Sequence, residues 1–171
     1  MSVDRLVDVS GHTQPDICFV VNTPSRFMVE LRREHWVGAK HVLRYIAGMV
    51  DYGLDYVIGD RFRLTGYSDS DWAGCVVNRK STSRCCFRLG STVVSWFSRK
   101  QKSVALSSSK AEYMAISQAS CEAIWLRKML VGQFGRELRP TVIYCDNQSC
   151  IKLFENPLFH DRSKHVAIRY H

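Results

Sequence analysis

The spacing of hydrophobic and polar residues divides the chain into a helical segment and a longer region of strands and helices. Between residues 34 and 50, hydrophobic residues recur every three or four positions, which predicts an amphipathic helix. Its predicted apolar face consists of Ala39, Val42, Leu43, Ile46 and Val50. Before it, an apolar run begins at residue 16, and Asn22-Thr23-Pro24-Ser25 is a typical start for a short helix. Glycines then interrupt the pattern and the composition changes near residue 60, where we expect a domain boundary.

Beyond residue 60 the pattern alternates between strands and helices. The predicted order is three strands, a long helix, a strand and a short helix. Alternation at residues 61–65 marks the first strand, which runs on to Asp69, and the other elements lie at residues 85–89, 92–97, 107–131, 141–145 and 151–154. Gly90-Ser91 is predicted to form the hairpin turn between the second and third strands. We therefore expect an α/β domain over residues 61–171, preceded by a small helical segment over residues 1–60.

The composition is that of a folded protein from a reducing compartment. Hydrophobic residues make up 46% of the 171 residues and charged residues 23%, which argues against disorder. The longest apolar runs are far shorter than the roughly 18 residues that a membrane span needs. Asp4 and Asp8 lie where a signal peptide requires apolar residues, and no Cys-x-x-Cys occurs among the seven cysteines. We expect an intracellular protein that is neither secreted nor bound to a membrane.

The net charge of +8 comes from one block of the chain. Residues 61–110 contain ten basic residues and only two acidic ones, Asp69 and Asp71, whereas charges nearly balance elsewhere. Such a block is typical of a surface that binds a polyanion, above all nucleic acid. The alternative is a solvated hairpin whose charges serve solubility alone.

Three acidic residues lie at the ends of predicted elements. Asp69 ends the first predicted strand, Asp146 ends the last one, and Glu112 lies close to the start of the long helix. In a sheet with a helix packed on it, these positions can converge. Carboxylates beside basic residues suit hard divalent cations such as Mg²⁺. Two such ions about 3.5–4 Å apart can activate a water and stabilise the leaving oxygen of a phosphodiester.

Each of these acids also has a purely structural interpretation. Asp69 and Asp71 are typical turn residues. Ser109-Lys110-Ala111-Glu112 has the spacing of a capping box, in which the glutamate serves only the start of its helix. Asp146-Asn147 can cap the short helix that follows. Spacing alone leaves both interpretations open.

Several motifs follow one another in a fixed order along the second region. They are Gly66-Tyr67-Ser68-Asp69-Ser70-Asp71-Trp72, Arg79-Lys80-Ser81-Thr82-Ser83, Ser95-Trp96-Phe97-Ser98-Arg99-Lys100-Gln101, Ala111-Glu112-Tyr113, Tyr144-Cys145-Asp146-Asn147-Gln148-Ser149 and Lys164-His165-Val166-Ala167-Ile168-Arg169-Tyr170-His171. In this order and spacing they resemble the ribonuclease H domain of copia-type LTR retrotransposon polyproteins. Upstream, Pro15-Asp16-Ile17, Ser25-Arg26-Phe27-Met28 and Leu43-Arg44-Tyr45-Ile46 resemble the end of the same polyprotein's reverse transcriptase and its connection.

The resemblance implies a ribonuclease H-like fold over residues 61–171, in which helices pack on a mixed β-sheet. It also implies a two-metal endonuclease that hydrolyses the RNA strand of RNA–DNA hybrids with Mg²⁺, for which Mn²⁺ is a substitute. Asp69, Glu112 and Asp146 match catalytic, metal-binding acids of the family, and Asp71 is a further candidate ligand.

Other family features lie beyond the matching region. The family's fourth acid lies on a final helix beyond the stretch that ends at His171, so the resemblance implies impaired activity for residues 1–171. Asp71 and Asp161 are candidate stand-ins for it. The polymerase's aspartate pair lies upstream, so no polymerase site is expected in this segment.

The resemblance further implies a nucleic-acid partner, an RNA–DNA hybrid above all, and the remainder of a reverse transcriptase polyprotein. The family acts in cytoplasmic virus-like particles and in the nucleus. Trp72 is a candidate platform for base stacking. The candidate phosphate contacts are the basic residues Lys80, Arg84, Arg99, Lys100 and Lys102.

Two further interpretations remain open. The first is a non-catalytic nucleic-acid-binding module derived from a retroelement, and the second is a decayed reading frame without a function. A zinc site is not expected, although Cys145, Cys150, His160 and His165 have a spacing similar to that of a zinc finger. Its middle interval is too short, and Cys145 falls inside a predicted core strand.

Overall fold

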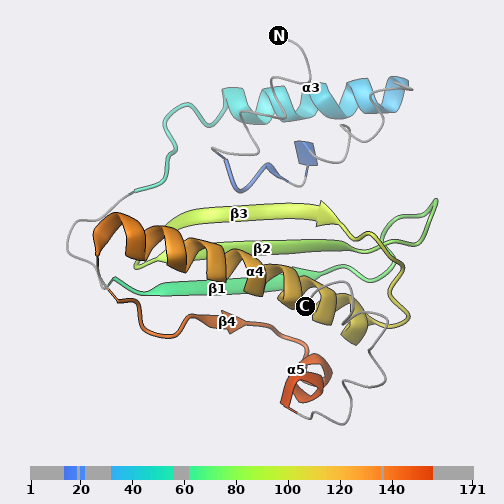
Figure 1. The fold of residues 1–171 in the computed structure, drawn as a ribbon. Coiled ribbons are helices and arrows are strands. Elements are labelled where there is room, and N and C mark those ends of the chain that lie inside the picture. Colours follow the sequence, from blue (N-terminus) through green and yellow to red (C-terminus); the bar gives the residue numbers. More distant parts are fainter. Residues whose placement is uncertain (1–13, 19, 22–31, 56–61, 136, 156–171) are drawn as a thin grey trace. The chain divides into compact units, whose positions relative to one another are not determined.

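The computed structural model of the chain describes residues 14–18, 20–21, 32–55, 62–135 and 137–155. The helices are α3 (Arg33–Ala47), α4 (Ser108–Phe134) and α5 (Gln148–Glu155), and the strands are β1 (Leu64–Ser70), β2 (Thr82–Leu89), β3 (Thr92–Lys100) and β4 (Val142–Tyr144) (Figure 1). The chain divides into two compact units near residue 55.

The first unit contains the predicted amphipathic helix, α3. Val42 is buried against Ile17 and Val21, with Ile46 packed beside them. The Tyr45 hydroxyl donates a hydrogen bond to Asp16 Oδ2 over 3.0 Å. Leu43, which was predicted to share the apolar face, is exposed. The short helix predicted after Asn22 lies outside the described residues.

The second unit is a mixed four-stranded sheet with the order β3-β2-β1-β4. β1 pairs antiparallel with β2, from Leu64 opposite Leu89 to Ser70 opposite Ser83. β1 pairs parallel with β4, with Tyr67 opposite Tyr144. The predicted α/β class and its mixed sheet are therefore confirmed, as is the predicted order of strands and helices. The hairpin turn between β2 and β3 is also as predicted, and Gly90 adopts a φ of +64° there.

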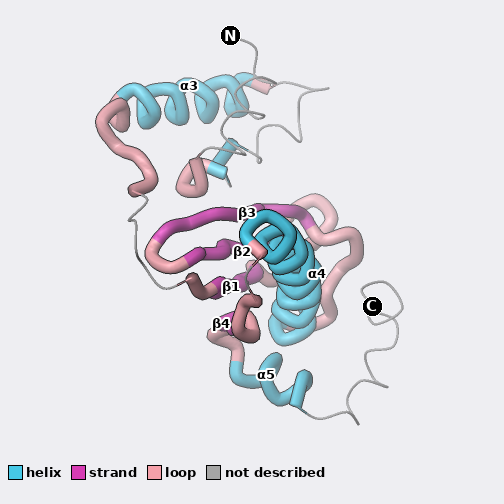
Figure 2. Tube along the Cα trace, turned by 60° about the vertical axis from the view of Figure 1, so that its left-hand side comes forward, coloured by secondary structure: helices cyan, strands magenta, loops and turns pink. Residues whose placement is uncertain are grey.

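Helix α4 covers one face of this sheet (Figure 2). Small residues let the helix backbone approach the strands closely, and Ala111, Ala115 and Ala119 are fully buried. On the strand side the core is formed by Leu64 and Phe87, which are 1% and 0% exposed. Alanines at these helix positions therefore fix the distance at which α4 lies from β1 and β2.

The start of α4 differs from the capping box proposed above. Ser107 is the N-cap, and its side chain accepts a hydrogen bond from the Lys110 N–H over 3.3 Å. Ser109 is therefore already inside the helix, and Glu112 lies beyond its first turn. The capping interpretation of Glu112 is wrong, because the helix begins before the serine it required.

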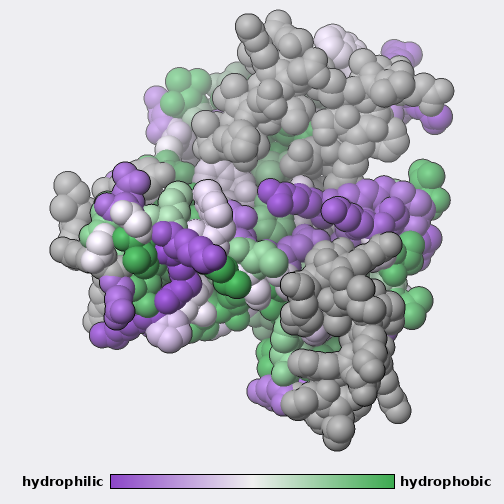
Figure 3. All heavy atoms as spheres, viewed as in Figure 1, coloured by the Kyte–Doolittle hydropathy of each residue, from purple (hydrophilic) through white to green (hydrophobic). Residues whose placement is uncertain are grey.

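The carboxyl ends of β1, β3 and β4 point toward the same end of the sheet, where α4 begins (Figure 1). The loop between β1 and β2 leaves the sheet at this end, and its residues Val76 and Val77 are each 85% exposed. Figure 3 shows hydrophobic side chains on the surface at the right-hand side of the view. Within the described residues, none of the helices is both long and apolar enough to cross a membrane. None of the seven cysteines, all of them described, forms a disulfide.

Candidate active site

The parallel pairing of β1 and β4 brings Asp69 and Asp146 to neighbouring positions. Tyr67 and Tyr144 are partners across this pair, and their rings stack with centroids 5.4 Å apart. Each aspartate follows its tyrosine by two residues. Because side chains alternate along a strand, Asp69 extends from the same face of β1 as Tyr67. Asp146 lies just past the end of β4 and is exposed.

Glu112 reaches from α4 to the ends of both strands. Its Oε1 accepts a hydrogen bond from the Ser70 backbone N–H over 2.9 Å. Its Oε2 accepts one from the Cys145 thiol, with 3.8 Å between sulfur and oxygen. Glu112 is only 5% exposed. The carboxylate is thus held between β1 and the residue that follows β4.

The surroundings of Glu112 raise its pKa to about 7. Burial is the largest cause, because a desolvated carboxylate is less stable than a carboxylic acid. The negative charges of Asp69 and Asp146 act in the same direction, whereas the hydrogen bonds from Ser70 and Cys145 oppose the shift. Asp69 and Asp146 both lie near enough to act on Glu112, so the structure brings the three predicted acids into one neighbourhood.

Glu112, Cys145 and Asp146 offer ligand atoms that all lie within 4.8 Å of one another. Burial raises the pKa of the Cys145 thiol above its ordinary value, so this sulfur is protonated and uncharged at neutral pH. The charged donors are then carboxylate oxygens, which Mg²⁺ and Mn²⁺ prefer over sulfur. The residues present therefore fit a hard divalent cation.

Asp69 makes an ion pair with a residue on the neighbouring strand. Its Oδ2 lies 2.9 Å from an Arg84 guanidinium nitrogen. Asp69 belongs to β1, so the turn interpretation does not describe it. The ion pair therefore uses Oδ2 of a carboxylate that was predicted to bind Mg²⁺.

Asp71, the further candidate ligand, is tied to the backbone. Its Oδ1 accepts a hydrogen bond from the Thr82 N–H over 2.6 Å, and its Oδ2 lies 3.9 Å from Arg84. A Cβ added to Gly74 would lie 2.6 Å from Asp71 Oδ2, so the loop after β1 folds tightly around this carboxylate. Asp71 therefore fastens the loop to the start of β2, as a turn residue does.

Gln101 organises the site, although sequence reasoning did not single it out. It is 1% exposed, and its Nε2 lies within 3.2 Å of Ser70 Oγ, Ser83 Oγ and the Ala111 carbonyl oxygen. These acceptors belong to the end of β1, the start of β2 and the start of α4. The only signal in the sequence was an amide side chain directly after the basic Arg99-Lys100 pair. Such a side chain needs hydrogen-bond partners once it is buried.

The candidate phosphate contacts differ in their surroundings. Arg99 and Lys102 are exposed near the end of β3, and Lys80 is half-buried before β2. The Lys100 ammonium donates a hydrogen bond to Cys75 Sγ over 2.8 Å, and this contact is the main reason that the pKa of Cys75 falls to about 7. Arg84 is held by the aspartates.

Trp72, the candidate stacking residue, lies in the loop after β1. Its Nε1 donates a hydrogen bond to the Ala105 carbonyl oxygen over 3.2 Å. The indole is nevertheless 56% exposed. One edge of the ring is therefore anchored while much of its surface faces solvent.

Asp146 does not cap α5, which was its purely structural interpretation. Asn147 Oδ1 accepts a hydrogen bond from the Cys150 N–H over 2.9 Å, so Asn147 and not Asp146 caps this helix. Cys150 is completely buried in a cluster with Tyr113 and Met114. His160, Asp161 and His165 lie outside the described residues, so the zinc spacing and the Asp161 stand-in are untested.

The chain is similar to Pol polyproteins of plant transposons. It is 43% identical over 159 residues to the Retrovirus-related Pol polyprotein from transposon RE1 of Arabidopsis thaliana, a match that covers 93% of this chain and 11% of that protein. It is 41% identical over 159 residues to the Retrovirus-related Pol polyprotein from transposon TNT 1-94 of Nicotiana tabacum, covering 93% of this chain and 12% of that protein. The chain thus corresponds to a small part of each polyprotein.

A third relative is much shorter. Secreted RxLR effector protein 161 of Plasmopara viticola is 46% identical over 114 residues, which are 67% of this chain and 80% of that protein. No protein-family profile matches the chain. No solved structure matches it either.

Proposed function

Because the chain belongs to the Pol polyprotein family of copia-type retrotransposons, we propose that its sheet-containing unit is a ribonuclease H-like domain. The proposed reaction is hydrolysis of the RNA strand of RNA–DNA hybrids, with Mg²⁺ as the cofactor and Mn²⁺ as a substitute. The protein would act as one part of a larger polyprotein, because the match covers only 11–12% of each of these relatives.

The observation that carries this proposal is the position of Glu112 between two other acids. Three carboxylates from two strand ends and one helix share one neighbourhood, and their mutual repulsion helps to raise the pKa of Glu112 to about 7. A buried carboxylate next to two like charges is costly to the fold, because both desolvation and repulsion disfavour its charged form. A divalent cation offsets this repulsion.

The residues of the chain take distinct roles in the proposal. Glu112 and Asp146 would hold the cation, while Ser70 and Cys145 orient the Glu112 carboxylate through their hydrogen bonds. Asp69 would complete the ligand set. When bound, the metal would polarise the phosphodiester and lower the pKa of an attacking water. Gln101 would act as a positioning residue, because it fixes the end of β1 to the start of α4.

Basic residues at the same end of the sheet support binding of a polyanion. Arg99 and Lys102 lie close to the carboxyl end of β3, which points in the same direction as the carboxyl ends of β1 and β4 (Figure 1). The exposed face of Trp72 lies in the loop that follows Asp69. An RNA–DNA hybrid would be recognised there through its backbone and its 2′-hydroxyls, with no dependence on base sequence.

The second candidate function is a non-catalytic nucleic-acid-binding module. The ion pair between Arg84 and Asp69 favours it, since a neutralised Asp69 is a poorer ligand for a cation. Both candidates predict binding to nucleic acid, but only the first predicts turnover.

Cleavage of a strand-labelled panel tests the proposal. The full chain is incubated in Mg²⁺ with an RNA–DNA hybrid, an RNA duplex and a DNA duplex of one sequence, and each is repeated in EDTA. We expect fragments of the RNA strand from the hybrid alone, and none in EDTA. Binding to all three duplexes without any cleavage would support the binding module instead.

A further inference from the structure

Arg84 and Asp69 lie directly opposite each other on β2 and β1. They are Cα partners in the antiparallel register, so their side chains extend from the same face of the sheet. One guanidinium nitrogen lies 2.9 Å from Asp69 Oδ2, and the other lies 3.9 Å from Asp71 Oδ2. A single guanidinium thus serves two carboxylates at the end of β1.

This ion pair contributes little to the fold. The side chains of Arg84 and Asp69 are 38% and 54% exposed, and pairs in such surroundings are screened by water and ions. The end of β1 is held independently by Gln101, and Asp71 is held by the Thr82 N–H. The end of β1 and the loop after it are thus held by bonds that do not involve Arg84.

Asp69 lies outside the metal-ligand group of the described residues. Glu112, Cys145 and Asp146 form that group. The charge of Asp69 nevertheless acts on Glu112, so the two carboxylates are close. A guanidinium and a divalent cation both require the negative charge of Asp69 and its Oδ2, and each excludes the other from this oxygen.

We propose that Arg84 is a resident counter-ion of this site, which competes with a divalent cation for the Asp69 carboxylate and thereby weakens metal binding. The inference rests on the proposed function, since it concerns the same site. Arg84 is then a positioning residue that acts through Asp69. In this role the Arg84 guanidinium neutralises Asp69, whereas its charge alone had predicted a contact with phosphate.

Mn²⁺ binding to the full chain, measured from the electron paramagnetic resonance signal of the free ion, tests the proposal without any need for catalysis. We expect R84Q to raise the association constant for Mn²⁺ by about tenfold, the low end of what one adjacent opposite charge does to the proton affinity of a carboxylate. R88Q is the matched control. Arg88 extends from the same strand and bonds only to the Ser91 carbonyl oxygen in the described contacts, so R88Q loses the same charge without touching the acids.

A double-mutant cycle identifies Asp69 as the mediator. In a D69N background, R84Q should leave Mn²⁺ affinity unchanged, because the contested carboxylate is gone. Thermal unfolding of each variant shows that it is folded, and R84K, which keeps the charge but loses the forked geometry, should fall between wild type and R84Q.

Three results would overturn the inference. One is an equal gain in R84Q and R88Q, which would show a general effect of net charge. Another is a gain from R84Q that persists in D69N. The third is Mn²⁺ binding that E112Q and D146N abolish but R84Q leaves unchanged, and this result would reject the role of Arg84 while the proposed function stands. If wild type and R84Q bind no Mn²⁺, or bind it as well after E112Q and D146N are introduced, both this inference and the proposed function fail.

Discussion

The Ser70 backbone N–H donates a 2.9 Å hydrogen bond to Glu112 Oε1, which joins two residues that lie 42 positions apart in the chain. This bond fixes the end of β1 to the second turn of α4. It also leaves the other oxygen of Glu112 facing Cys145, next to Asp146. The proposed site is therefore built on two strand ends and a helix, which are more rigid supports than loops.

The raised pKa of Glu112 predicts how stability depends on pH in the absence of metal. The folded protein holds this proton up to a pH of about 7, whereas the unfolded chain releases it near 4.5. Between these values the folded state binds more protons, so the free energy of unfolding should fall as pH rises. The contribution is complete below pH 4.5 and lost above pH 7.

Thermal unfolding in EDTA across this range measures the effect. E112Q should flatten the decline, and E122Q, a change of the same kind on the same helix, is the control for the loss of one carboxylate. Parallel curves for wild type and E112Q would show that Glu112 does not titrate in this range.

Gln101 predicts a second, larger effect on stability. Replacement by leucine leaves Ser83 Oγ and the Ala111 carbonyl oxygen without a buried partner, which costs about 1–3 kcal/mol of the free energy of unfolding. Gln118 is the matched control: its buried Oε1 has no partner among the described residues, and neither has Gln101 Oε1, so the two variants differ in the loss of the Gln101 Nε2 bonds. Q118L should therefore be neutral or slightly stabilising in urea unfolding. Equal losses in both variants would remove Gln101 from its proposed role.

The sequence predicted the order of the elements because runs rich in β-branched and aromatic residues alternate with segments of helical spacing. The start of α4 was harder, since Ser107, Ser108 and Ser109 are equally good caps in isolation. Ser107 is the cap in the folded protein, in which Ala111 and Met114 are buried at the start of α4. Local preference did not decide among three adjacent serines.

The composition of the site was predictable only in part. The three acids stand at element ends, which the pattern of the sequence marks. The pairing of Asp69 with Arg84 depends on strand register, which links residues 15 apart and is fixed by tertiary packing. Gln101 was missed for the same reason, because its partners come from three separate elements.

The close packing of β1 predicts a strong effect at Gly66. A Cβ at this position would lie 2.6 Å from Phe87 Cε1, and Phe87 is completely buried. G66A should therefore cost about 1–3 kcal/mol of the free energy of unfolding. G132A on α4 meets nothing within 4 Å and should instead stabilise by about 0.5–1 kcal/mol. Urea unfolding at equilibrium measures both, and a neutral G66A would show that the strands can separate locally.

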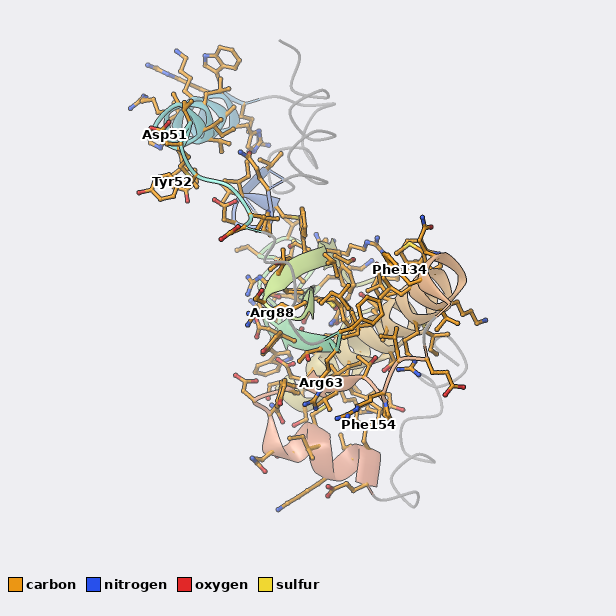
Figure 4. The ribbon with its side chains drawn as sticks, turned by 90° about the vertical axis from the view of Figure 1, so that its left-hand side faces the viewer. Asp51, Tyr52, Arg63, Arg88, Phe134 and Phe154 are labelled. Carbon is orange, nitrogen blue, oxygen red and sulfur yellow. The ribbon has the colours of Figure 1, made fainter. Side chains whose placement is uncertain are left out.

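The location of the basic residues predicts the salt dependence of nucleic-acid binding. Each phosphate contact that is lost should lower the slope of log affinity against log salt by about one. The double variant R99A/K102A should therefore lower it by about two. R63A/R88A removes the same charge from the opposite end of the sheet, where both residues are labelled in Figure 4, and should keep the slope. Equal slopes in the two double variants would place the nucleic acid elsewhere.

Cleavage of an RNA–DNA hybrid by wild type, E112Q and D146N at one Mg²⁺ concentration tests the central claim most directly. Both substitutions keep size and shape while they remove a negative charge from the ligand group. The proposed site predicts that wild type cuts the RNA strand and that each variant loses at least about a hundredfold in rate, the order of effect of a positioned catalytic group. Equal cleavage by all three proteins would contradict it.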